Sequence, residues 1–79
     1  MNTRGAPLVK STDAWLLLLR DQEALLGQPG ARYRLLVDEA HGLHRAGVID
    51  RDHLSDLLEQ ADGALAYAVE ALLDKHENQ

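Results

Sequence analysis

The chain has 79 residues, of which 46% are hydrophobic and 27% charged, and it contains no cysteine. This length corresponds to one small domain, the apolar fraction is too high for a disordered chain, and the lack of cysteine excludes disulfides, thiolate zinc sites and a cysteine nucleophile. Because no apolar run is long enough to span a bilayer and no signal peptide is visible, we expect a soluble cytoplasmic protein that does not enter a membrane. A core this small without covalent links is marginal, which favours a homodimer or a complex with another protein.

Charge is divided unequally along the chain, whose formal net charge is −5. Residues 1–47 carry six basic and five acidic side chains, whereas residues 48–79 carry two basic and eight acidic ones. An acidic half is repelled by phosphate backbones, so direct binding of nucleic acid is disfavoured. The expected partner is instead a larger protein with a basic surface.

The N-terminal part of the chain is expected to form a leader and then a helix. Residues 1–10 show no periodicity and are expected to be flexible. Ser11 or Thr12 is a suitable N-cap for a helix that runs to about Leu26, where glycine and proline residues follow and end it.

Two leucines of this first helix fall outside its main apolar face. Leu16 and Leu17 make the run that ends at Leu19 apolar nearly all round, and a helix of that kind is either central in a core or placed between two partners. We therefore predict that Leu16 and Leu17 take part in self-association or in a partner interface.

A second helix fits Ala31 to Ala46, and Gly47 ends it. Within it, Asp38-Glu39-Ala40-His41 is similar to the signature of the DEAH-box helicases. That chemistry also requires a glycine-rich phosphate-binding loop, which this sequence does not contain, so we interpret the match as a coincidence.

The histidines raise the question of a metal site. His41 and His44 follow Asp38 at intervals of three residues, so that neighbouring members of this set could share a helix face. Bundle sites for metals use several inward-facing carboxylates and histidines, and the expected apolar faces contain no Asp or Glu. We therefore expect solvated histidines, His53 and His76 included, with no metal, no cofactor and no catalysis.

The strongest pattern lies in the last expected helix, from Arg51 to about His76, with Asp50 as its N-cap and residues 77–79 as a frayed tail. Its apolar stripe consists of Leu54, Leu57, Leu58, Ala61, Leu65, Ala68, Val69 and Leu72. Its acidic stripe, on the opposite side, consists of Asp52, Asp56, Glu59, Glu70, Asp74 and Glu77. Asp62 lies at the edge of the acidic stripe, where it is either solvated or receives an Arg or Lys side chain from a partner.

Parts of this helix resemble the Hha/YmoA family of small helical modulators. The similar segments are Ile49–Leu54, which contains the capped helix start, and Ala61–Ala66, in which Ala-Asp is followed by Leu-Ala. The resemblance implies an all-helical protein that binds the dimerisation region of H-NS-type nucleoid proteins. It also implies that Asp62 is the counterpart of a charged residue that the family uses for binding.

Together these patterns predict an all-α fold in which residues 11–76 form a bundle of three helices, with four as the alternative. The preferred function is a non-catalytic regulator that presents an acidic helix face to a basic partner, as an Hha-like co-regulator of a nucleoid protein. The partner-binding residues would be Asp52, Asp56, Glu59, Asp62, Glu70 and Asp74. A second interpretation is a phage- or plasmid-encoded inhibitor that blocks a nucleic-acid-binding surface of its target, and a third is a metal-dependent enzyme that uses the histidines.

Overall fold

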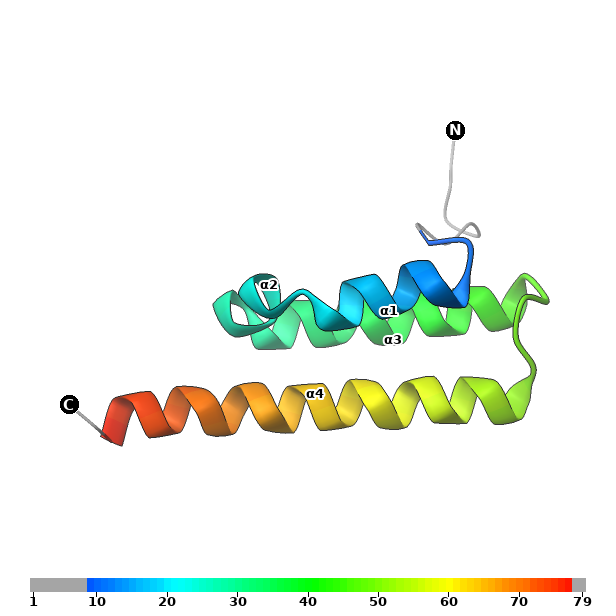
Figure 1. Ribbon diagram of the computed structural model, residues 1–79. Helices are drawn as coiled ribbons and strands as arrows, with labels where there is room; N and C mark the ends of the chain where they lie inside the picture. The colour runs from blue at the N-terminus through cyan, green and yellow to red at the C-terminus, as the bar shows by residue number, and fades with distance from the viewer. Residues whose placement is uncertain (1–8, 78–79) are drawn as a thin grey trace.

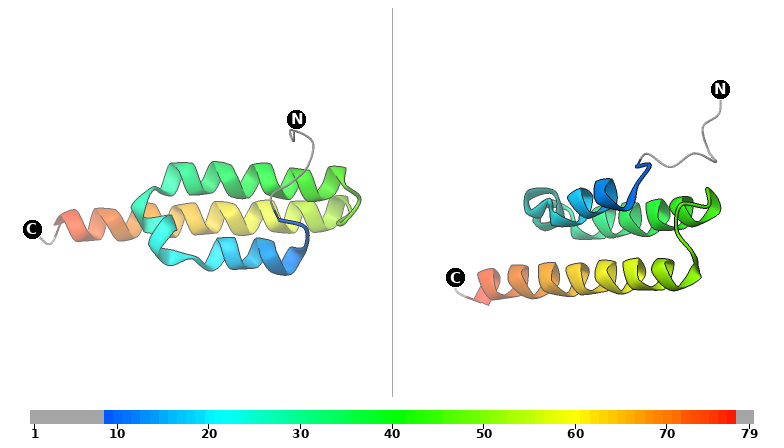
Figure 2. Two further views of the ribbon diagram at one scale, coloured as in Figure 1. Left: turned by 90° about the horizontal axis from the view of Figure 1, so that it is seen from above. Right: turned by 45° about the vertical axis from the view of Figure 1, so that its right-hand side comes forward.

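A computed structural model describes residues 9–77 and confirms the all-α fold over that range. This described range contains four helices: α1 (Thr12–Arg20), α2 (Gln22–Gly27), α3 (Pro29–Arg45) and α4 (Arg51–Glu77). The first two helices form one interrupted arm that lies beside α3, and α4 lies under both (Figure 1; Figure 2). Successive arms run in opposite directions, as short connections between helices require. Residues 9–77 therefore form a bundle with three arms and four helices.

The first arm is not the continuous helix to Leu26 that the sequence predicted. Asp21 interrupts it with φ −75° and ψ 88°, outside the helical region. Its backbone N–H donates to the Leu18 carbonyl (3.4 Å), while its carboxylate accepts a hydrogen bond from the Ala24 N–H (3.2 Å) and so caps α2. An aspartate side chain that competes for backbone hydrogen bonds in this way favours a cap over a helix interior.

The second arm begins earlier than the sequence predicted, at Pro29 instead of Ala31. Gln28 separates the two helices with φ −146° and ψ 77°. A proline cannot continue the helix before it. It is well suited to the first position of the next helix, where its missing N–H costs no hydrogen bond. Pro29 therefore starts α3.

The end of α3 confirms the prediction for Gly47, whose φ of 80° lies in the left-handed region. The Gly47 N–H donates to the His44 carbonyl (3.0 Å) and the Val48 N–H to the Leu43 carbonyl (2.9 Å). This pair of bonds is the Schellman motif, which satisfies the last carbonyls of a helix and requires a positive φ at the glycine.

The last helix matches its predicted range within one residue. Asp50 caps it by accepting a hydrogen bond from the His53 N–H (2.8 Å), as expected. With 27 residues it spans about 40 Å, whereas the 17 residues of α3 span about 26 Å. The C-terminal end of α4 therefore extends beyond the turn between α2 and α3 (Figure 1).

The core lies where the three arms meet. Its largest fully buried side chains are Trp15, Leu36, Leu43 and Leu57. Trp15 also donates from Nε1 to the Leu36 carbonyl (2.9 Å), so the indole fills the centre and its polar atom is satisfied. This contact fixes the position of α1 on α3.

Val9 belongs to the core, although it falls in the expected flexible leader. It is buried, and its N–H donates to Oε1 of Glu39 (2.9 Å). Glu39 is itself buried, whereas the sequence predicted apolar faces without a carboxylate. A buried carboxylate requires a hydrogen-bond partner, and the segment before α1 supplies it. Lys10, the last position of the expected leader, is exposed. Residues 1–8 of that leader and the last two positions of the expected tail lie outside the described residues.

Candidate protein-binding surface

The predicted acidic stripe forms an exposed face on α4. Its members in the structure, all exposed, are Asp52, Asp56, Glu59, Glu70 and Asp74, which we call the acidic face. They lie opposite Leu57, Ala61 and Ala68, the buried residues of the same helix. Within residues 9–74 the one ion pair joins Arg32 to Asp21 (3.9 Å), so no cation of that part neutralises the acidic face. The side chain of Glu77 lies outside the described part.

Asp62 differs from these five residues because it has a partner within the chain. Its Oδ1 accepts a hydrogen bond from the Tyr33 hydroxyl (2.7 Å), which joins α3 to α4. This hydrogen bond, together with partial burial and the negative charge of Asp62, raises the pKa of the Tyr33 hydroxyl above its ordinary value of 10.0. The sequence analysis placed Asp62 at the edge of the acidic stripe and predicted that its carboxylate contacts either solvent or a partner protein. Its contact with Tyr33 depends on the register between two helices, which one sequence does not reveal.

The two leucines predicted to form an interface have different environments. Leu16 is partly buried and packs against the core, and this contact already explains why the position is apolar. Leu17 is 69% exposed on α1. Leu17 is thus the more exposed of the two, and the role of both in an interface stays a prediction.

The side chains of His41, His44 and His53 belong to the described part of the chain, and that of His76 lies outside it. His41 and His44 are exposed on α3, and His53 is half-buried on α4. Among the described residues there is no group of three or more histidine or carboxylate side chains placed to hold a metal ion. In the Asp-Glu-Ala-His stretch, Asp38 and His41 face solvent while Glu39 binds the backbone of Val9.

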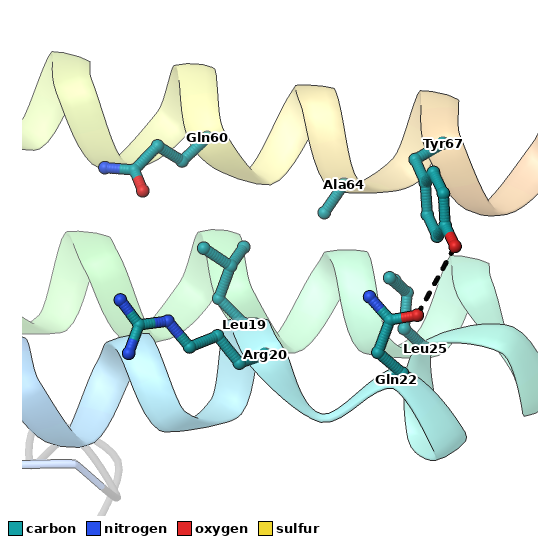
Figure 3. A pocket seen from close by; sticks show the side chains of 7 residues that line it. All are labelled: Leu19, Arg20, Gln22, Leu25, Gln60, Ala64 and Tyr67. Atoms are coloured by element: carbon teal, nitrogen blue, oxygen red, sulfur yellow. Dashed lines mark hydrogen bonds between the residues drawn. The ribbon is translucent and has the colours of Figure 1, made fainter.

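A groove that the sequence did not predict runs between α4 and the first arm. It has a volume of about 350 Å³ and is lined by Leu19, Arg20, Gln22, Leu25, Gln60, Ala64 and Tyr67. Figure 3 shows the α4 residues opposite those of the arm, with Leu19, Leu25 and Ala64 between the polar side chains. The lining residues of the arm stand on both sides of the break at Asp21, and the α4 wall has a small side chain at Ala64. The groove therefore results from the interrupted helix and from that alanine.

The groove is closed at one point by a weak polar contact. The Tyr67 hydroxyl donates to Oε1 of Gln22 at 3.5 Å, the long limit for such a bond (Figure 3). Tyr67 is nevertheless 52% exposed. An arriving side chain would therefore displace little in order to reach the apolar floor.

The part of α4 that follows Ala68 also exposes apolar side chains. Val69, Leu72 and Leu73 are 43%, 36% and 56% exposed. Two of these residues, Val69 and Leu72, belong to the stripe that the sequence assigned to the core. No helix within residues 9–77 is long and apolar enough to cross a membrane.

Comparison of the chain with protein-family models, with curated proteins and with solved structures finds no match. The resemblance to the Hha/YmoA family therefore stays a prediction. The candidate surface rests on the residues of this chain.

Proposed function

We propose that this protein is a non-catalytic regulator that binds a larger protein through the acidic face of α4. The observation that supports the proposal is the set of five exposed carboxylates on one side of a single helix, without a cation of the described chain beside them. Like charges on one face repel each other, and a basic partner surface relieves that repulsion. The expected partner is therefore a protein with exposed Lys and Arg side chains.

The charge of the acidic face would act mainly on the rate of association. Complementary charges steer two proteins toward each other, and exposed charges lose this influence as salt rises. An Hha-like co-regulator of a nucleoid protein in the cytoplasm is one form of the proposal. In that form Asp62 would contribute less directly than the resemblance implies, because its carboxylate already binds Tyr33.

The same observation favours a second candidate, a phage- or plasmid-encoded inhibitor of a nucleic-acid-binding protein. Surfaces that bind nucleic acid gather Lys and Arg side chains against a row of phosphates. A row of carboxylates along one face of a helix offers a similar series of negative charges. The two candidates differ in whether nucleic acid and this protein compete for the partner.

The test uses two double variants with the same change in net charge. Asp56→Lys with Glu59→Lys reverses two positions of the acidic face, whereas Glu23→Lys with Asp38→Lys reverses two exposed carboxylates on α2 and α3. Both variants and the wild type are used to capture partners from cell extract, and the partner that mass spectrometry identifies is purified. Circular dichroism shows whether each variant keeps its helix content.

Association kinetics with the purified partner then decide the proposal. We expect the first variant to associate about ten-fold more slowly or worse and the control variant to resemble the wild type, with rates that fall as salt rises. Competition with DNA or RNA for the same partner would favour the inhibitor over the co-regulator. Binding that is indifferent both to salt and to reversal of Asp56 and Glu59 would refute the proposal.

A further inference from the structure

We propose that the groove between α4 and the first arm binds an amphipathic helix of the partner, with its apolar stripe in the groove and a row of Lys or Arg side chains against the acidic face. The inference rests on the proposed function and names the kind of partner segment that the site accepts. The shape, the floor and the charged edges of the groove support it.

The floor of the groove is apolar and open. Leu19 and Leu25 come from the first arm and Ala64 from α4. The volume of about 350 Å³ is far larger than the roughly 10–15 Å³ that a single water molecule needs in the same measure. An amphipathic helix inserts side chains spaced by three, four and seven residues into a groove of this kind.

The floor also continues along α4. Ala71 follows Ala64 by seven residues and so lies on the same side of the helix, where it is half-buried. Tyr67 stands between these two positions on the groove wall. An occupant aligned along α4 would therefore meet small apolar side chains over two turns and a half-exposed aromatic ring beside them.

The two edges of the groove carry opposite charges. On the α4 side, Asp56 precedes the wall residue Gln60 by four positions, and Glu70 follows Tyr67 by three, so both carboxylates lie beside the wall. On the other side the wall contains Arg20. A helix in this groove is thus favoured when its basic side chains lie along α4 and its edge toward Arg20 is acidic or neutral.

This charge pattern favours a basic helix over a second copy of α4. The exposed side of α4 carries the carboxylates of the acidic face, and a second copy packed there would bring its own carboxylates toward those of the first. Like charges placed opposite each other at an interface disfavour that pairing. A small apolar ligand would fill the floor but would make no use of the acidic edge.

The experiment selects helical peptides from a displayed random library, each of about 18 residues or five turns, with the full-length protein as bait. We expect the selected peptides to combine apolar residues at helical spacing with Lys or Arg on one edge only. The matched variants are Ala64→Lys, which fills the floor, and Ala66→Lys, which adds the same side chain at an exposed position two residues later. We expect Ala64→Lys to weaken peptide binding at least ten-fold and Ala66→Lys to leave it nearly unchanged.

Tyr67→Ala provides a second variant should Ala64→Lys lose helix content, because Tyr67 is half-exposed and its loss leaves the core intact. Tyr67→Ala should also weaken binding of the selected peptides. The inference is overturned when no peptide is enriched, or when the enriched peptides are acidic or lack an apolar stripe. It is also overturned when the peptides bind the Ala64→Lys variant with the same affinity as the wild type. Dimerisation of the wild type that Ala64→Lys abolishes would assign the groove to a second copy instead. Partner binding that is lost on reversal of Asp56 and Glu59 but kept in Ala64→Lys would retain the proposed function and reject the groove.

Discussion

Replacement of Leu57 by alanine tests where the core face of α4 lies. Leu57 is 1% exposed and belongs to the core cluster at the meeting point of the three arms. The change removes three carbon atoms, worth about 2.4 kcal/mol at roughly 0.8 kcal/mol for each buried CH₂ group. The cavity left behind adds to this, and the total for a buried Leu→Ala change is about 2–5 kcal/mol.

The effect is large for a domain of this size. A chain of 79 residues has a free energy of unfolding of about 4–12 kcal/mol, so Leu57→Ala removes a large part of it. For a loss of about 3 kcal/mol, the melting temperature falls by roughly 12–24 °C. Urea unfolding followed by circular dichroism measures the free energy, and thermal unfolding gives the melting temperature.

Leu73→Ala is the matched control, because it makes the same chemical change in the same helix at a position that is 56% exposed. Its cost should stay within about 0.5 kcal/mol. Leu58 and Leu65, which are only half-buried, should fall between the two. Equal losses for Leu57→Ala and Leu73→Ala would refute the assignment of the core face.

Four further substitutions each test the role of a single residue. The protonated Tyr33 hydroxyl donates a hydrogen bond to Asp62, and its pKa is raised above 10.0. The stability that this hydrogen bond contributes is therefore complete below pH 10 and is lost as pH rises through the pKa of the folded state. Tyr33→Phe should flatten the decline of stability above pH 10, as measured by urea unfolding at several pH values. Glu39→Leu leaves the buried Val9 N–H without an acceptor and should cost about 1–3 kcal/mol, whereas Glu39→Gln keeps an acceptor and should cost less in the same assay. Gly47→Ala should cost about 1–2 kcal/mol, since φ is 80° while nothing lies within 4 Å of the added Cβ, and Gly47→Asn should cost less in thermal unfolding. Leu17→Lys should leave the melting temperature nearly unchanged because the side chain is 69% exposed, and sedimentation of both proteins would show whether α1 mediates self-association.

The features that the sequence predicted correctly are those with local signals. The cap at Asp50, the glycine at 47 and the long stripe between them and the C-terminus specify α4 and its connection to α3 within a residue. Ser11 likewise caps α1, where its hydroxyl accepts a hydrogen bond from the Ala14 N–H (3.1 Å). Each signal acts within four residues of its own position, so a single sequence contains it in full.

The features that the sequence missed depend on contacts between distant segments. The burial of Glu39 depends on its hydrogen bond with Val9, which is thirty positions away in the sequence, so nothing near Glu39 in the sequence indicates it. The periodicity of the first helix gave no sign that the Asp21 side chain would cap a new helix there. The apolar stripe was assigned to the core as far as Leu72, but burial depends on how far the neighbouring arms reach, and they end first.

The unequal lengths of the helices have a consequence for the cooperativity of the fold. Up to Ala68, the last buried residue of α4 within the described side chains, unwinding the helix would expose core and so requires much of the free energy of global unfolding. Beyond that residue the helix is held mainly by its own backbone hydrogen bonds, and helices of fewer than about 12 residues are marginal by themselves in water. The final turns of α4 are thus free to open and reform while the rest of the bundle stays folded, and backbone amide exchange should become steadily faster from Ala68 toward the end of α4.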